Sequence, residues 1–241
     1  MSLEIYLCIS VGRTINLFLH PMKHAITQRN FAFITLLILS AGSSARAQTA
    51  WELKKDKDGI RVYSKASEHS RFDLLRVETI LPAKLSSLAA LILDIGNYPH
   101  WSFNTREAHV LKKISGSELY FYSLINSPWP VSDRDLAVHL RISQDAVTKV
   151  MTISAESVPD LIPRKKDLVR VPVSTERWLV TPLPDGRIRV EYQLEIDPGA
   201  SIPAWLINSF STKGPFETFT HLREQIKGSK YRDANISFIR D

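Results

Sequence analysis

Residues 197–227 constrain the fold of this 241-residue chain more than any other segment. They read DPGASIPAWLINSFSTKGPFETFTHLREQIK, and their apolar residues recur at steps of three and four, the spacing of one helix face. Ser201 suits an N-cap, and Pro203 suits a first helical turn. We expect a helix of about 24 residues, roughly 36 Å long. An apolar face of that length needs a second layer to cover it.

Gly214-Pro215 interrupts the middle of this predicted helix. Proline lacks a backbone N–H and clashes with the preceding turn, so we expect a kink at this position. Two interpretations remain open. The segment is either a C-terminal helix that closes a core or a hinged lid over a cavity.

Residues 22–47 have the pattern of a secretory signal. A basic start precedes an apolar run over residues 31–39, and Ala45-Arg46-Ala47 is a small-x-small cleavage site. The apolar run is too short to span a membrane. We therefore predict that translation starts at Met22, that residues 1–47 are a signal peptide region outside the fold, and that the mature protein is periplasmic or secreted.

Removing this leader changes the charge of the chain. The remaining residues hold 27 Lys+Arg against 24 Asp+Glu, so the net charge falls from +6 to +3. A weak and dispersed positive charge does not favour nucleic-acid binding. The single cysteine, Cys8, also lies in the leader, so the mature chain is expected to have neither a disulfide nor a thiolate nucleophile.

The rest of the chain has mainly the pattern of strands. Gly, Pro, Asn and Asp residues mark the turns between them. We expect strands at residues 51–55, 60–65 and 72–81, a helix at 84–95, five or six further strands between 108 and 196, and turns at 58–59, 115–116, 144–145 and 185–186.

Two of these strands alternate strictly between apolar and polar residues. The apolar positions are Ile188, Val190, Tyr192, Leu194 and Ile196 in one, and Leu136, Val138, Leu140 and Ile142 in the other. One face of the sheet should therefore be covered and the other should face solvent. An antiparallel sheet with one apolar face, and a long helix to cover it, predicts an α+β fold.

Two segments carry a family resemblance. One is NSPWPVSDRD at residues 126–135, followed by the strand LAVHLRI, and the other is DPGASIPAWL at residues 197–206. Both resemble START domains, the lipid-transfer domains of the helix-grip (Bet v 1-like) superfamily, and the order of elements agrees over residues 51–227. The resemblance implies a curved antiparallel sheet wrapped around a long C-terminal helix, with the domain at residues 48–230 and a C-terminal tail at 231–241.

The same resemblance implies binding, and transfer, of a lipid or other hydrophobic ligand. The ligand would occupy an internal apolar cavity, gated by the C-terminal helix and residues 127–134. The expected protein is a monomer with transient membrane contact and no nucleic-acid partner. The candidate cavity and gate residues come from the gate segments, from the apolar positions of the alternating strands and from the apolar face of the predicted helix. They are Trp129, Arg134, Leu136, Val138, Leu140, Tyr192, Leu194, Trp205, Phe210, Phe216 and Phe219.

Arg134 has two interpretations. Its parity places it on the apolar side of its strand, where an unpaired charge is costly. It either lies at the strand end, reaching solvent or pairing with Asp133 or Asp135, or it contacts a ligand head group or the gate. Sterol-carrying START domains often hold a buried acid–arginine pair deeper in the tunnel. Leu140 and Ile142 occupy the inward positions here, which argues against a sterol.

Other kinds of site lack their sequence patterns. No histidine pair has metal-ligand spacing together with a carboxylate, and the sequence has no nucleophile elbow or glycine-rich phosphate loop. We therefore expect no cofactor, no metal and no enzymatic activity. Two alternatives stay open: a cyclase- or aromatase-like enzyme of the same superfamily, with Tyr192, Ser123 and Thr152 facing the tunnel, and a partner-binding module with a filled core.

Overall fold

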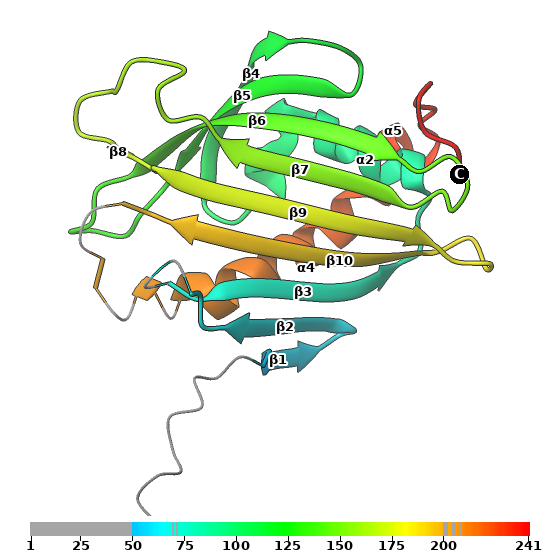
Figure 1. Cartoon of the computed structure of the whole chain (residues 1–241), viewed down its shortest axis with the longest axis horizontal. Coiled ribbons are helices and arrows are strands. Elements are labelled where there is room, and N and C mark those ends of the chain that lie inside the picture. The colour runs from blue at the N-terminus through cyan, green and yellow to red at the C-terminus, as the bar shows by residue number, and fades with distance from the viewer. Residues whose placement is uncertain (1–49, 69, 71, 200–201, 204–205, 208) are drawn as a thin grey trace, which may run out of the picture. The chain divides into compact units, whose positions relative to one another are not determined.

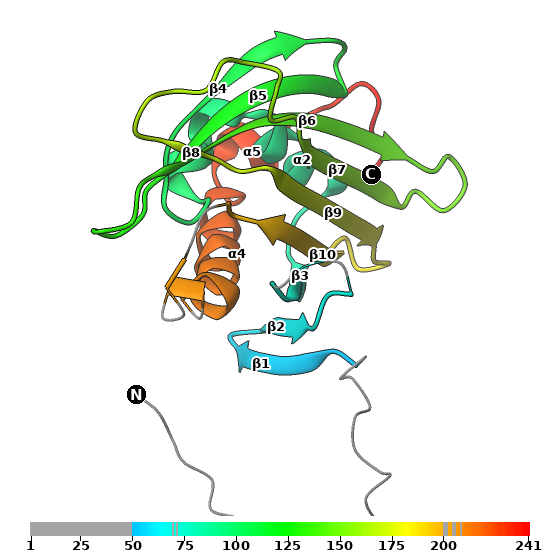
Figure 2. The same cartoon turned by 60° about the vertical axis from the view of Figure 1, so that its left-hand side comes forward.

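A curved antiparallel sheet forms the frame of the protein in the computed structural model, which describes residues 50–241 except 69, 71, 200–201, 204–205 and 208 (Figures 1 and 2). Nine of its ten described strands follow the order β1-β2-β3-β10-β9-β7-β6-β5-β4, and β8 pairs with β6 in parallel. The strands are β1 (Glu52–Lys57), β2 (Ile60–Lys65), β3 (Leu74–Leu81), β4 (Thr105–Lys113), β5 (Glu118–Ile125), β6 (Arg134–Gln144), β7 (Met151–Ser157), β8 (Val169–Arg170), β9 (Val173–Pro182) and β10 (Ile188–Asp197). The predicted leader, residues 1–47, lies outside the described residues.

The helices lie on one face of this sheet (Figures 1 and 2). They are α2 (Leu85–Leu93), α4 (Gly214–Gln225) and α5 (Ser229–Arg232), and a 3-10 helix, Ile95–His100, follows α2. Buried apolar side chains of the sheet and of these helices form one continuous core. The α+β fold class predicted from the sequence, a sheet wrapped around a C-terminal helix, is confirmed.

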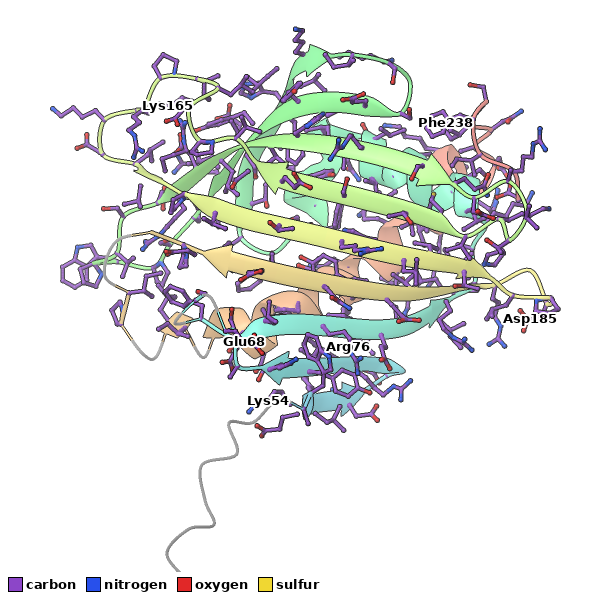
Figure 3. The ribbon with its side chains drawn as sticks, in the orientation of Figure 1. Lys54, Glu68, Arg76, Lys165, Asp185 and Phe238 are labelled. Atoms are coloured by element: carbon purple, nitrogen blue, oxygen red, sulfur yellow. The ribbon has the colours of Figure 1, made fainter. Side chains whose placement is uncertain are left out.

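Tight turns join the neighbouring strands where the sequence predicts them. Asp58 and Gly59 both have positive φ (52° and 71°), and Gly186 in the β9–β10 turn has φ 79°. In the β6–β7 turn, the Asp145 carboxylate accepts hydrogen bonds from two backbone N–H groups. Asp185, in the β9–β10 turn, is labelled in Figure 3.

The alternation of β10 sets its two faces as predicted. Ile188, Val190 and Tyr192 are buried, whereas Arg189 and Gln193 are exposed. The same rule holds for the second half of β6, but it fails at the start of that strand.

Asp135 was predicted to lie on the solvent-facing side of β6, and this prediction is wrong. Its side chain is 1% exposed and pairs with Arg170 through two contacts of 2.8 and 2.9 Å. Arg170 also donates to the carbonyl oxygens of Pro159, Ile162 and Pro163. The loop over residues 158–168 therefore covers the second face of the sheet at the beginning of β6, a tertiary contact that strand periodicity does not report.

The C-terminal helical segment is irregular near its middle, next to the predicted interruption at Gly214-Pro215. A π-helical turn, Ser209–Lys213, precedes α4, and Pro215 lies in the first turn of α4 itself. Lys213 is itself in a helical conformation (φ −69°, ψ −46°), so α4 continues directly from the π-helical turn. Gly214-Pro215 thus lies where the π-helical turn changes to regular α-helix, and proline, which lacks an N–H, suits such an interruption.

The last residues of the chain belong to the folded unit, in contrast to the predicted tail at 231–241. Tyr231 and Ile239 are buried. The Asp241 carboxylate accepts hydrogen bonds from the Ser86 N–H (2.8 Å) and hydroxyl (2.7 Å) at the start of α2. The first-turn N–H groups of α2 need such an acceptor, which the sequence places far away in the chain.

Candidate ligand-binding cavity

A cavity of about 360 Å³ lies between the sheet and the N-terminal part of the C-terminal helical segment. Side chains of β6, β7, β9 and β10 form one wall, and described residues between Pro198 and Phe219 form much of the other. This volume is at the lower end of the range of roughly 300 to 1,000 Å³ found for ligand pockets. The space between the helix and the sheet is therefore not completely filled by the protein.

Aromatic rings form the part of the wall where α4 meets the sheet. The ring of Phe219, on α4, lies 5.2 Å from Trp178 and 5.4 Å from Tyr192, which are 4.7 Å apart. Tyr98 and Trp101, 4.6 Å apart, line the cavity from the 3-10 helix. Such ring pairs add packing energy beyond their buried area, so this part of the wall is well fixed.

Two segments outside the sheet border the cavity, and we call their described residues the rim: residues 126–133, and residues 198–211 except 200–201, 204–205 and 208. Ser127 belongs to the first, and Ile202 and Leu206 belong to the second. Gly199 has φ +68°, and a Cβ there would approach Val169 to 3.2 Å. Glycine thus lets the second rim segment turn tightly against β8.

Arg134 begins β6 and lines the cavity beside the rim. The residue is 5% exposed, and its Nη1 donates to the carbonyl oxygen of Ser132 and to the Ser127 hydroxyl (3.3 Å). Burial lowers the pKa of Arg134, and the nearby Asp133 carboxylate offsets part of that effect. The interpretation that Arg134 reaches solvent is wrong, because only 5% of its surface is exposed.

Glu176 places a partly buried carboxyl group in the cavity wall, which Arg134 and the exposed Asp73 also line. Burial raises the pKa of Glu176 from 4.5 to about 7, and hydrogen bonds from Trp178 and Tyr192 lower it only in part. Burial also raises the pKa of Tyr192 and of Tyr98, and the charge of Glu176 adds to both shifts. The side chain is half-buried because part of its surface faces the cavity.

The structure separates the residues predicted for the site into four groups. Arg134, Leu136, Leu140, Tyr192, Leu194 and Phe219 line the cavity. Val138 and Phe216 are buried but are not among the lining residues, and the Phe216 ring instead lies 3.6 Å from the Lys55 ammonium group.

Trp129 projects away from the cavity and is 91% exposed. Trp205 and the side chain of Phe210 lie outside the described part of the chain.

Glu176 is a cavity residue that was not predicted from the sequence. The available signal was the parity of β9, where Ser174, Trp178 and Val180 are buried and share a face with Glu176. For the alternative enzyme, Ser123 and Thr152 are not among the cavity-lining residues. Within the described residues, no group of three His, Cys, Asp or Glu side chains is placed to hold a metal ion, and no helix is long and apolar enough to cross a membrane.

Comparison with known proteins gives consistent matches. The START domain family model matches residues 40–231. An uncharacterized protein of Pseudomonas aeruginosa is 35% identical over 174 residues, covering 72% of this chain and 85% of that protein. The phosphatidylcholine transfer protein of Bos taurus is 28% identical over 177 residues, covering 70% and 81%. The crystal structure of a STAR-related lipid transfer protein fragment from Xanthomonas axonopodis superposes with a TM-score of 0.68 at 33% identity, covering 74% of this chain and 99% of that one.

The Glu176 carboxyl group makes stability depend on pH. Its pKa is raised in the folded state, so its ionisation destabilises the fold as pH rises from 4.5 through about 7. Glu176→Gln removes that penalty and keeps an oxygen acceptor. We expect the variant to be more stable than the parent by on the order of 3 kcal/mol at pH 8.5, and to differ much less at pH 5. Urea unfolding at the two pH values measures both differences.

Glu156→Gln is the matched control, because Glu156 is an exposed carboxylate on β7, the strand beside β9. A Glu176→Gln effect that is the same at pH 5 and pH 8.5 would contradict the burial of an ionisable group in the cavity.

Proposed function

The chain belongs to the START domain family, and we propose that it binds a lipid or other hydrophobic ligand in the cavity and transfers it between membranes. The observation that carries this proposal is the apolar space of about 360 Å³ enclosed by the sheet and the C-terminal helical segment. A lipid chain in water costs about 0.8 kcal/mol per exposed methylene, and apolar walls such as Leu140, Ile153 and Phe219 remove that cost.

We propose that the rim is the gate. The C-terminal half of α4 is fastened to its surroundings: Arg223 donates to the Asp58 carbonyl oxygen and the Thr79 hydroxyl, and Gln225 accepts from Asn97. The π-helical turn before Gly214 departs from regular helical geometry, as such turns do at many functional sites. Movement of the second rim segment relative to a fixed α4 would open the cavity without disrupting the core.

Two features of one end of the sheet support transient membrane contact. Trp129 is almost fully exposed in the β5–β6 loop, and tryptophan favours the membrane–water interface. Arg164, Lys165 and Lys166 are exposed in the loop before β8, which pairs with the start of β6. Figure 3 shows Lys165 at the end of the sheet opposite Asp185. Basic residues near an anionic surface each contribute about 1 kcal/mol, so this end would face a membrane.

We propose that the protein acts as a monomeric carrier without enzymatic activity or a nucleic-acid partner. One observation favours the cyclase-like alternative: Glu176, whose pKa is about 7, lies beside Tyr192 in the cavity, as general acid–base catalysis requires. Incubation of the protein with lipid extracted from its host separates the two functions. Recovery of the lipid at unchanged mass supports a carrier, and a product that disappears with Glu176→Gln supports an enzyme.

Filling the cavity tests the proposed function. Ala155 lines the cavity on β7, so Ala155→Phe should occupy the ligand space at a cost of less than about 2 kcal/mol in stability. We expect the folded variant to take up labelled fatty-acyl lipid from vesicles at least tenfold less well. Ser154→Phe adds the same ring to the other face of β7 and should leave uptake unchanged. Normal uptake by folded Ala155→Phe would contradict ligand binding in this cavity.

Trp129→Ala tests the membrane contact. Because the side chain is exposed, stability should change by less than about 0.5 kcal/mol. Binding to vesicles in a sedimentation assay should weaken roughly tenfold, the equivalent of 1.4 kcal/mol. Val147→Ala is the control, since Val147 is 89% exposed in the β6–β7 turn, at the far end of β6. Equal effects of both substitutions would remove the β5–β6 loop from the proposed membrane surface.

We also propose export, from the signal pattern at residues 22–47. N-terminal sequencing of protein from the native host should then begin near Gln48 or Thr49. Recovery of a chain that starts at Met1 from the cytoplasm would contradict this proposal.

A further inference from the structure

Arg134 is a buried cation in the wall of the cavity. Only 5% of its surface is exposed, and its two hydrogen-bond acceptors among the described residues, the Ser132 carbonyl oxygen and the Ser127 hydroxyl, are uncharged. A guanidinium group keeps its charge in proteins, so burial cannot be relieved by loss of a proton. A buried charge of this kind is normally paired.

The neighbouring carboxylates are committed to other cations. Asp133 accepts from Arg106 (3.0 Å) and from the Ser127 N–H (2.8 Å). Asp135 pairs with Arg170 on the opposite face of the sheet. Throughout the part of the chain that the structure describes, no carboxylate lies within ion-pair distance of the Arg134 guanidinium. Among the described residues, the charge of Arg134 is therefore compensated only in part, by the nearby Asp133 carboxylate.

In the described part of the chain, two carboxyl groups line the cavity: Asp73, which is exposed to solvent just before β3, and the partly buried Glu176, which is too far away to be the missing partner. Strand pairing places Leu140 opposite Ala155, and Ala155 opposite Glu176. Arg134 lies six residues before Leu140 on β6, a separation along the strand of roughly 20 Å at 3.3 Å per residue. The cavity thus has a cationic group at the rim and a carboxyl group further along the sheet.

These two groups determine how an amphiphile would lie. An anionic head beside Glu176 would be repelled when that carboxyl group is ionised. A head beside Arg134 would meet a guanidinium fork, which matches the two oxygens of a carboxylate or phosphate, and the Ser127 hydroxyl next to it. From there an alkyl chain follows Leu136 and Leu140 into the apolar part of the cavity.

We propose that the cavity selects an anionic amphiphile, whose carboxylate or phosphate head pairs with Arg134 at the rim while its alkyl chain occupies the interior. This inference rests on the proposed lipid-binding function and specifies the chemical class of the ligand. A fatty acid and a lipid phosphate monoester share the chemistry that Arg134 recognises, so both are included in the test.

The test compares three ligands with the same 16-carbon chain, namely hexadecanoate, hexadecyl phosphate and hexadecanol, each bound to the delipidated protein and measured by native mass spectrometry at pH 8. We expect at least one acid to bind tenfold or more tightly than the alcohol. Arg134→Gln should reduce that preference to less than about threefold by weakening the acid and leaving the alcohol unchanged. Arg134→Lys should retain part of it, because the charge remains without the fork.

Arg141→Gln is the matched control, since Arg141 is on the same strand but exposed on the other face. It should preserve the preference of the parent protein. The comparison of acid with alcohol in the parent needs no variant, so the test stands even if Arg134→Gln does not fold. Equal binding of acids and alcohol would overturn the inference but leave the lipid-binding function intact. Binding of none of the three ligands would overturn both. The tighter of the two acids identifies the head group.

Discussion

The contact of Phe219 with Trp178 and Tyr192 is the interaction on which the arrangement of the C-terminal segment depends. It attaches α4 to the middle of the sheet, and the buried Leu222 and Ile226 extend the attachment toward the end of the helix. On the other side of Phe219, the segment before Gly214 contacts the cavity instead of a filled core. The same apolar surface of the sheet therefore provides stability at one end and ligand space at the other.

Polar groups in the cavity reduce stability, and their positions are informative for that reason. Glu176 remains in an apolar wall although burial raises its pKa to about 7. Arg134 remains buried although the adjacent Asp133 and Asp135 pair with other arginines. If the cavity were only a packing defect, replacing both groups with apolar residues would increase the stability of the protein. Their presence is consistent with a ligand whose polar atoms have fixed positions.

The period-two pattern was sufficient to predict the inward positions Leu136, Leu140 and Tyr192, and the Gly, Pro, Asn and Asp residues were sufficient to predict the turns of the sheet, because these features depend on local geometry. Features set by distant contacts were not predictable in this way. The burial of Asp135 depends on a loop more than 20 residues later in the chain. The fixed position of the last residues depends on the hydrogen bond between Asp241 and the start of α2. The alternation of a strand also cannot show which of its inward-facing residues reach the cavity. Val138 and Leu140 share a face, yet only Leu140 lines the cavity.

The central claim is that the cavity carries one amphiphilic molecule per chain. Native mass spectrometry of protein purified from its own host without detergent tests this most directly. The account predicts a folded species heavier than the chain by the mass of one lipid, which is released on unfolding and carries an acidic head group in tandem spectra. A folded species with the mass of the bare chain, which also gains no mass after incubation with vesicles of the host's lipids, would contradict the account.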